Sequence, residues 1–188
     1  QRARALINGD WTFRGEGSTA GFSLPVPHGF WGQTVGDIFP AAPGADAKAA
    51  SGWLSRRLAI PVEWRGRRIA LEFSGAGHVV EALVNGLYCG GHIGGFDPFS
   101  IDISGAAVPG AENEILLRVT GSAATRLAAP NPLISAEAYS MIRPGSGPND
   151  YLAMGGPDGL DAGIWDDVYL RATPWARIER ISIRTFTR

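Results

Sequence analysis

The sequence has little of what several classes of protein need. A single cysteine, Cys89, excludes an internal disulfide, and a formal net charge of −1 lacks the basic excess of a nucleic-acid-binding surface. No apolar run is long enough to span a bilayer as a helix. Charged residues make up only 19% of the chain and hydrophobic residues 45%, which is not a disordered composition. We therefore expect a folded domain whose partner is neither nucleic acid nor a membrane.

The residues of familiar catalytic and metal sites are also scarce. The three histidines, His28, His78 and His92, are far apart, and none stands at metal-ligand spacing. The chain has no Gly-x-Ser-x-Gly elbow and no phosphate-binding loop. The adjacent pair Asp166-Asp167 cannot converge on one glycosidic bond, because neighbours on a strand point to opposite faces. A turn cap or an arginine partner is the favoured role for this pair, and we expect no cofactor and no metal.

Alternation of apolar and polar residues, in contrast, is abundant and predicts short β-strands. Asn85-Gly86 predicts a type I′ turn between two of them, with the return strand starting at Leu87. The glycine patch from Gly90 to Gly95 is interpreted as the connection to the strand that follows. Short strands separated by Gly and Pro are typical of a β-sandwich or jelly roll. The predicted strands lie at 7–13, 24–26, 53–60, 68–73, 79–84, 87–89, 99–103, 115–119, 168–170 and 178–183, with one possible short helix at 133–142.

Two segments, 32–51 and 120–162, do not have a strand pattern. Loops this long in a compact domain are usually functional or disordered. For the second segment the composition leaves two interpretations open, a ligand-binding loop or a solvated excursion. Its polar and aromatic residues include Tyr139, Arg143, Asn149, Asp150, Tyr151, Asp158 and Asp161.

The tryptophans fall into two groups, one expected in the core and one that could either pack or bind a ligand. Trp11, Trp53 and Trp64 fall in or beside predicted strands and are expected in the core. Trp31 and Trp165 sit beside loops, where either packing or stacking on a sugar ring would suit an amphipathic ring. For His92 a packing role is favoured over a ligand role.

Taken in order along the chain, these motifs resemble the N-terminal sugar-binding domain of glycoside hydrolase family 2, which includes β-galactosidases, β-glucuronidases and β-mannosidases. Each motif is weak alone, and their order is what makes the resemblance specific. The motifs are Asn8-Gly9-Asp10-Trp11-Thr12-Phe13, Val26-Pro27-His28, Arg56-Arg57 with Ile60-Pro61, Val84-Asn85-Gly86, Gly94-Gly95-Phe96-Asp97-Pro98-Phe99, Asp102-Ile103-Ser104, and Gly163-Ile164-Trp165 with Val168.

The resemblance implies a fold and a larger context. The fold would be an all-β, jelly-roll (galactose-binding-like) antiparallel β-sandwich forming a single domain over 1–188. In the family an immunoglobulin-like domain and a TIM barrel with two catalytic glutamates follow, and we expect these as intramolecular partners. The chain would then be part of a retaining exo-acting glycosidase that binds carbohydrate, and inactive alone. An exported and a cytoplasmic location both stay open.

The resemblance also implies which residues reach the sugar. By position before Gly163, Asp158 and Asp161 are the best candidates, where they would hydrogen-bond sugar hydroxyls. Further substrate-binding candidates are Arg143, Asn149, Asp150 and Trp165. Ser55, Phe96-Asp97 and Asp166 depart from the family pattern and leave the sugar specificity open. Two other readings remain, a free-standing carbohydrate-binding module and an interaction sandwich without sugar affinity.

Overall fold

The computed structural model describes residues 2–15, 19–27, 51–77, 79–94, 97–120, 163–176, 182 and 184–185. Every regular element of this part of the chain is a strand except one 3-10 turn, η1, at Val62–Trp64. The strands are β1 (Ala3–Leu6), β2 (Gly9–Gly15), β3 (Phe22–Val26), β4 (Ser51–Ala59), β5 (Arg68–Phe73), β6 (Ala76–Gly77), β7 (Val79–Val84), β8 (Leu87–Ile93), β9 (Phe99–Asp102), β10 (Glu112–Thr120), β11 (Gly163–Ile164) and β12 (Val168–Thr173).

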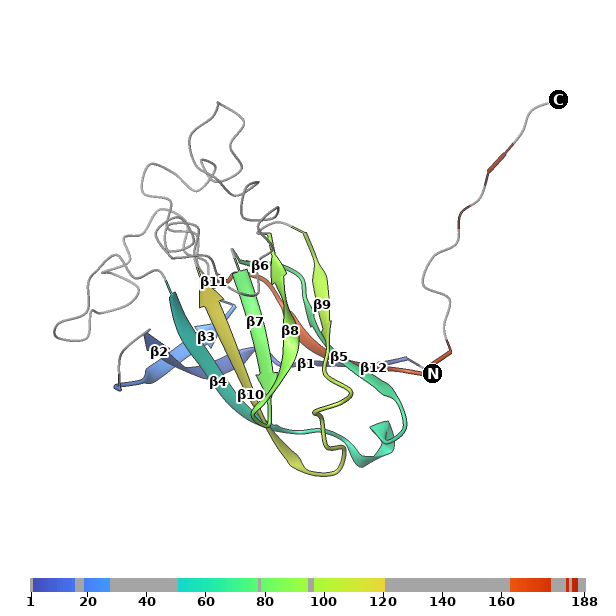
Figure 1. Cartoon of the computed structure of the whole chain (residues 1–188), viewed down its shortest axis with the longest axis horizontal. Helices are drawn as coiled ribbons and strands as arrows, with labels where there is room; N and C mark the ends of the chain where they lie inside the picture. The colour runs from blue at the N-terminus through green and yellow to red at the C-terminus, as the bar shows by residue number, and fades with distance from the viewer. Residues whose placement is uncertain are drawn as a thin grey trace.

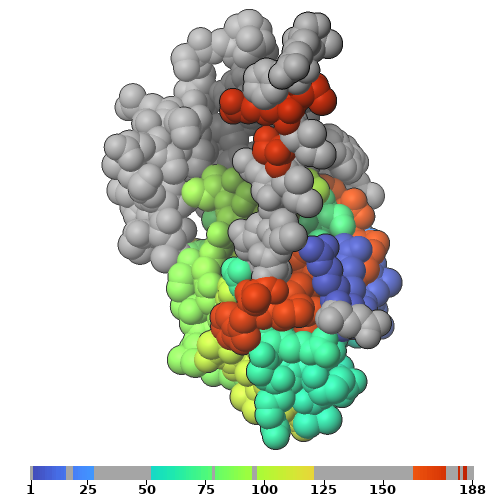
Figure 2. Space-filling view, turned by 90° about the vertical axis from the view of Figure 1, so that its right-hand side faces the viewer, coloured from blue at the N-terminus to red at the C-terminus, as the bar shows by residue number. Residues whose placement is uncertain are grey.

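The strands form two main sheets that face each other (Figure 1). One has four strands in the order β1-β12-β5-β9, and the other has six in the order β3-β2-β4-β10-β7-β8. A two-stranded sheet, β11-β6, lies at one end, and every pairing is antiparallel. In Figure 2 the segment around η1 (teal) forms the lower part of the surface, below the end of β12 (red). The predicted all-β jelly-roll sandwich is confirmed.

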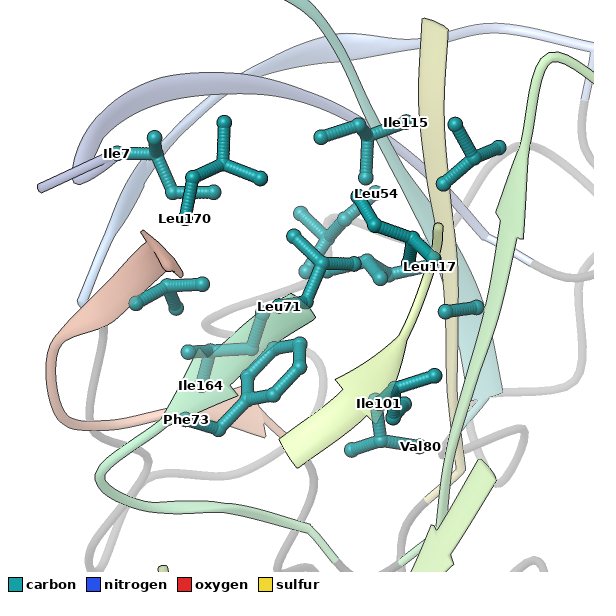
Figure 3. Packing of buried hydrophobic residues seen from close by; sticks show 14 of the residues in the cluster. Ile7, Leu54, Leu71, Phe73, Val80, Ile101, Ile115, Leu117, Ile164 and Leu170 are labelled. Atoms are coloured by element: carbon teal, nitrogen blue, oxygen red, sulfur yellow. The ribbon is translucent and has the colours of Figure 1, made fainter. Parts of the chain in front are cut away.

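The core fills the space between the two sheets (Figure 3). Leu71 and Phe73 of β5 point into it from the four-stranded sheet, and Leu54, Val80 and Leu117 point into it from the six-stranded sheet. Alternate residues of a strand face opposite sides, so an alternating sequence produces one buried face on each sheet. In β10 the buried positions are Asn113, Ile115, Leu117 and Val119, which matches the alternation in the sequence.

Most predicted strands are present, with different ends. The predicted strand 7–13 falls partly in β2, because Ile7 and Asn8 connect it to β1, which was not predicted. The strand predicted at 99–103 ends at Asp102. The short strands β6 and β11 were also missed. The possible helix at 133–142 lies outside the described residues, as does the strand at 178–183 apart from Ser182.

The hairpin between β7 and β8 has the predicted turn. Asn85 and Gly86 have φ values of 51° and 78°, the two positive values that a type I′ turn requires. The interpretation of the glycine patch was partly wrong, because Gly90 and Gly91 lie inside β8 and pair with β7. The register shifts between Ala82 and Leu83, and such a β-bulge accommodates the extra residue in β8.

Two of the three tryptophans expected in the core are buried, and one is not. Trp11 and Trp64 are buried, in agreement with the prediction. For Trp53 the prediction was wrong: its neighbours Gly52 and Leu54 are buried, while Trp53 points away from the core and lies against Arg118. The period of two was read correctly, but the sequence alone does not say which of two large apolar neighbours faces inward. Trp31 lies outside the described residues.

Candidate functional site

Several strands begin or end at the same end of the sandwich. Ser51, the first residue of β4, pairs with Thr120, the last residue of β10, and Thr120 also pairs with Val79, the first residue of β7. Val79 in turn pairs with Ile93 at the end of β8. Sheet β11-β6, with Gly163 opposite Gly77, lies at this end too, at the top of Figure 1. The chain enters β4 at Ser51 here, and it leaves the sandwich after Thr120 and rejoins it at Gly163 here, so we name this the loop end.

Only some of the residues predicted to bind sugar are among those that the structure describes. Arg143, Asn149, Asp150, Asp158 and Asp161 lie outside the described residues, so their assignment stays a prediction. Trp165 is described, and it follows β11 directly at the loop end. The structure therefore places one of the six predicted residues.

Trp165 is fixed against a glycine from another part of the chain. Its backbone N–H and that of Asp166 both donate to the carbonyl oxygen of Gly75, at 3.2 Å each. The indole covers Gly75 so closely that a Cβ there would lie 2.5 Å from Trp165 Nε1. Gly75 thus allows the half-buried indole to lie close against the backbone of the β5–β6 turn. Sequence reasoning did not single out Gly75, because nothing local connects it with residue 165.

Asp166 and Asp167 have structural roles, as the sequence suggested. Asp167 accepts hydrogen bonds from Asn8 Nδ2 and from the Tyr169 hydroxyl, each at 2.6 Å. The bonds from Tyr169 and Asn8 lower the pKa of Asp167, and the same carboxylate raises the pKa of Tyr169. Asp166 Oδ1 accepts from the Asp167 backbone N–H at 2.7 Å. The corner between β11 and β12 is therefore locked to the segment that joins β1 and β2.

His92 contributes to packing near the loop end. Its ring stacks on Phe99 with centroids 3.9 Å apart, and Phe99 stacks on Phe73 at 4.7 Å. His92 Nε2 is buried and has no hydrogen-bond partner among the described residues. Burial lowers the pKa of His92, an effect that the negative charge of Asp97 opposes. The predicted packing role is confirmed, and the neutral ring is the form that this environment favours.

The described part of the chain has neither a metal-binding cluster nor a membrane-spanning helix. There, no group of three or more histidine, cysteine or acidic side chains could hold a metal ion. No helix among these residues is both apolar enough and long enough to cross a bilayer. Among the described residues, the feature of the loop end that sequence analysis predicted is the half-buried indole of Trp165, held against Gly75.

Comparisons with known proteins point in one direction. No protein-family model matches the chain. A β-glucuronidase of Bacteroides fragilis is 29% identical over 120 residues, which are 63% of this chain and 16% of that protein. A β-glucuronidase of Paenibacillus borealis is 39% identical over 67 residues, 36% of this chain and 11% of its own length. The chain thus spans less than a fifth of the length of these relatives.

The fold comparison extends the similarity over nearly the whole chain. The structure of a β-D-glucuronidase from Dictyoglomus thermophilum superposes with a TM-score of 0.62 and 25% identity, covering 93% of this chain and 28% of that one. These findings agree with the resemblance carried by the ordered motifs: in sequence and in fold the chain is similar to part of β-glucuronidases, which are glycoside hydrolases.

Proposed function

We propose that the chain is the N-terminal sugar-binding domain of a retaining, exo-acting family 2 glycosidase whose substrates are β-glucuronides. The observation that carries this proposal is the loop end. There the strand ends, sheet β11-β6 and Trp165 come together, and the segment with the predicted sugar-binding residues rejoins the sandwich at Gly163. The related β-glucuronidases supply the substrate class.

The role of this domain is to shape the substrate pocket of a catalytic barrel. A barrel with two catalytic glutamates and an immunoglobulin-like domain would be its intramolecular partners. The carboxylates of Asp158 and Asp161 would accept hydrogen bonds from sugar hydroxyls, with Arg143, Asn149 and Asp150 as further contacts. Trp165 would offer its indole to the apolar face of the ring. None of these residues breaks the glycosidic bond, so the chain by itself does not turn over substrate.

Alanine variants of the enzyme that contains this chain test the proposal. Asp158→Ala and Asp161→Ala are expected to lower kcat/KM for 4-nitrophenyl β-D-glucuronide by about tenfold or more, since each loses a hydrogen bond to a charged acceptor. Asp10→Ala is the matched control, because Asp10 is an exposed aspartate of β2 on another part of the surface. Unchanged kcat/KM in both loop variants would remove these residues from the pocket.

Two other functions can be distinguished from the proposed one by whether the chain alone binds an oligosaccharide. A free-standing carbohydrate-binding module would bind an oligosaccharide saturably without any catalytic domain. An interaction sandwich would bind none and would need a protein partner. Turnover of 4-nitrophenyl β-D-glucuronide by the chain alone, free of contaminating enzyme, would contradict the proposed division of labour.

A further inference from the structure

The sequence contains two Asn-Gly steps, Asn8-Gly9 and Asn85-Gly86, and the function proposed above uses neither of them. In such a step the backbone nitrogen of glycine can attack the side-chain amide carbon of asparagine. The new N–C bond closes a five-membered succinimide ring, and the amide nitrogen leaves as ammonia with the proton of the glycine N–H. Water then opens the ring at one of its two carbonyls, which produces aspartate or isoaspartate. Glycine favours this attack because it has no side chain in the way and a permissive backbone.

Distant parts of the chain hold the amide of Asn8 in one orientation. Asn8 Nδ2 donates to Asp167 Oδ1 at 2.6 Å, and Asn8 Oδ1 accepts from the Val168 backbone N–H at 2.9 Å. The backbone carbonyl oxygen of Asn8 accepts from Arg56 Nη1 at 2.7 Å, which fixes the peptide that leads to Gly9. Ring closure turns the amide carbon toward the glycine nitrogen and expels Nδ2. The reaction must therefore break these tertiary hydrogen bonds.

Three hydrogen bonds hold the amide of Asn85 in the β7–β8 turn. Its Nδ2 donates to the Ala106 carbonyl oxygen at 2.9 Å and to Asn113 Oδ1 at 2.8 Å. Its Oδ1 accepts from the Glu114 backbone N–H at 3.0 Å, and its own backbone N–H donates to the Glu114 carbonyl oxygen at 2.9 Å. Asn85 is exposed, so water reaches this step. Hydrogen bonds, and not burial, are what oppose ring closure here.

The aspartate product does not fit at position 85, because it has no donor there. A carboxylate oxygen in place of Asn85 Nδ2 would face Asn113 Oδ1, which is also an acceptor. Asn113 is fully buried and cannot reverse its amide to compensate. Its Oδ1 accepts from the Val108 backbone N–H at 2.7 Å, and its Nδ2 donates to the carbonyl oxygens of Val108 and Ala111 at 3.0 and 2.9 Å.

At position 8 the aspartate product would place a second carboxylate against Asp167. The first carboxylate already accepts from the Tyr169 hydroxyl at 2.6 Å, so it is held in place. Two like charges this close disfavour the folded state. Isoaspartate would add one carbon to the backbone at either position, which a two-residue turn such as Asn85-Gly86 does not accommodate. Both products therefore oppose refolding.

We propose that Asn8 and Asn85 are deamidation sites that the folded sandwich protects and that unfolding exposes. Water is the only co-reactant. The rate in the folded chain then follows the fraction of molecules in which the hydrogen bonds of Asn8 or Asn85 are open. A chain that is modified while unfolded loses these bonds permanently. Deamidation at the two Asn-Gly steps thus converts reversible unfolding into irreversible unfolding over time.

Peptide mapping by mass spectrometry tests the protection. The chain is incubated at mildly alkaline pH, in buffer and in concentrated guanidinium chloride. Deamidation of Asn8 and Asn85 should be faster in the denaturant by about tenfold or more, because the folded chain reacts only when it opens. Asn113, which glutamate follows, is the internal control and should stay unmodified in both solutions. In the denaturant, Gly86→Ala should slow the reaction at Asn85 and leave that at Asn8 unchanged.

The variants Asn8→Asp and Asn85→Asp carry the aspartate products and test their fit. Each should unfold at a lower urea concentration than the wild type. Asn8→Ala is the matched control for position 8, since it removes the amide without adding a charge. Repulsion by Asp167 raises the pKa of the added carboxyl in the folded chain. Asn8→Asp should therefore gain stability relative to Asn8→Ala as the pH falls through that pKa.

The outcomes decide both parts of the proposal. Equal deamidation rates in buffer and denaturant at either asparagine overturn the protection, and so does an unfolded chain that is not deamidated. Aspartate variants that unfold at the same urea concentration as the wild type overturn the irreversible step. None of these results bears on the β-glucuronidase activity expected with Asp158 and Asp161, which is measured separately.

Discussion

At the scale of single residues, His92 shows how the fold selects one protonation state. Its ring stacks on Phe99, its Nε2 has no hydrogen-bond partner in the described part of the chain, and burial lowers its pKa. The folded-state pKa is thus below the unfolded value of about 6.5, so the unfolded chain binds more protons as the pH falls. The stability that neutral His92 contributes is present above about pH 6.5 and is lost as the pH falls through the folded-state pKa.

The variant His92→Phe should remove this pH dependence. Phenylalanine keeps a ring beside Phe99 but cannot be protonated. Between pH 7.5 and pH 5 we expect the free energy of unfolding to fall more steeply in the wild type than in the variant. Urea unfolding followed by circular dichroism at both pH values measures the difference. His28 and His78 are present in both proteins, so their titration cancels, and equal slopes would show that His92 titrates normally.

At the scale of elements, the β7–β8 hairpin depends on backbone conformation more than on packing. Gly86 has a φ of 78°, and a Cβ there would meet nothing within 4 Å. Gly86→Ala should therefore destabilise the chain by about 1–2 kcal/mol purely through the left-handed backbone. Gly105 is the matched control, because it too has open space around its Cβ position but no positive φ. Gly105→Ala should leave stability unchanged or slightly raised.

Thermal and urea unfolding of the two alanine variants decide this point. If Gly86→Ala and Gly105→Ala have the same free energy of unfolding, the turn does not need its glycine. The Asn85 side chain would then carry the hairpin, since it donates to Ala106 O and to Asn113 Oδ1 and accepts from the Glu114 backbone N–H.

The elements that could be predicted from the sequence are those with a local signal. β7, β10 and the Asn85-Gly86 turn follow from alternation and turn chemistry, and the structure has all three. β6 and β11 have two residues each, too few to show any period, and they exist only because they pair with each other. The glycines of β8 concealed the second half of that strand, whose pairing with β7 compensates for weak strand propensity.

In the candidate site, too, only the residues with a local sequence signal could be predicted. Trp165 was identified because a tryptophan beside a long loop is a local signal. Its support by Gly75 and the bonds from Asn8 and Tyr169 to Asp167 join distant parts of the sequence, and no local pattern contains them. Which side of β4 faces the core depends on its register with β10, which is a property of the sheet and not of the local sequence. Trp53 was assigned to the wrong side for this reason.

At the scale of the whole molecule, the sandwich separates a stable frame from the segments that it carries. The core draws on both sheets, from Ile7 after β1 to Leu170 in β12, so it forms only when the first and last strands come together. At the loop end, Thr120 pairs with Val79 and Gly163 pairs with Gly77. Since only residue 78 separates Gly77 from Val79, the Cα atoms of Thr120 and Gly163 are at most about 18 Å apart.

This geometry predicts that the frame folds without residues 121–162. A flexible linker of about ten Gly and Ser residues has a mean span of about 17 Å and can join Thr120 to Gly163. The shortened chain should keep the far-ultraviolet circular dichroism of the sandwich and unfold in one cooperative transition. In the enzyme that contains it, activity on 4-nitrophenyl β-D-glucuronide should fall sharply, because the predicted sugar-binding residues are gone.

A scrambled 121–162 segment of the same length controls for the change in chain length. Loss of cooperative unfolding in the shortened chain would mean that the segment belongs to the frame itself, whereas full activity would remove it from the substrate pocket.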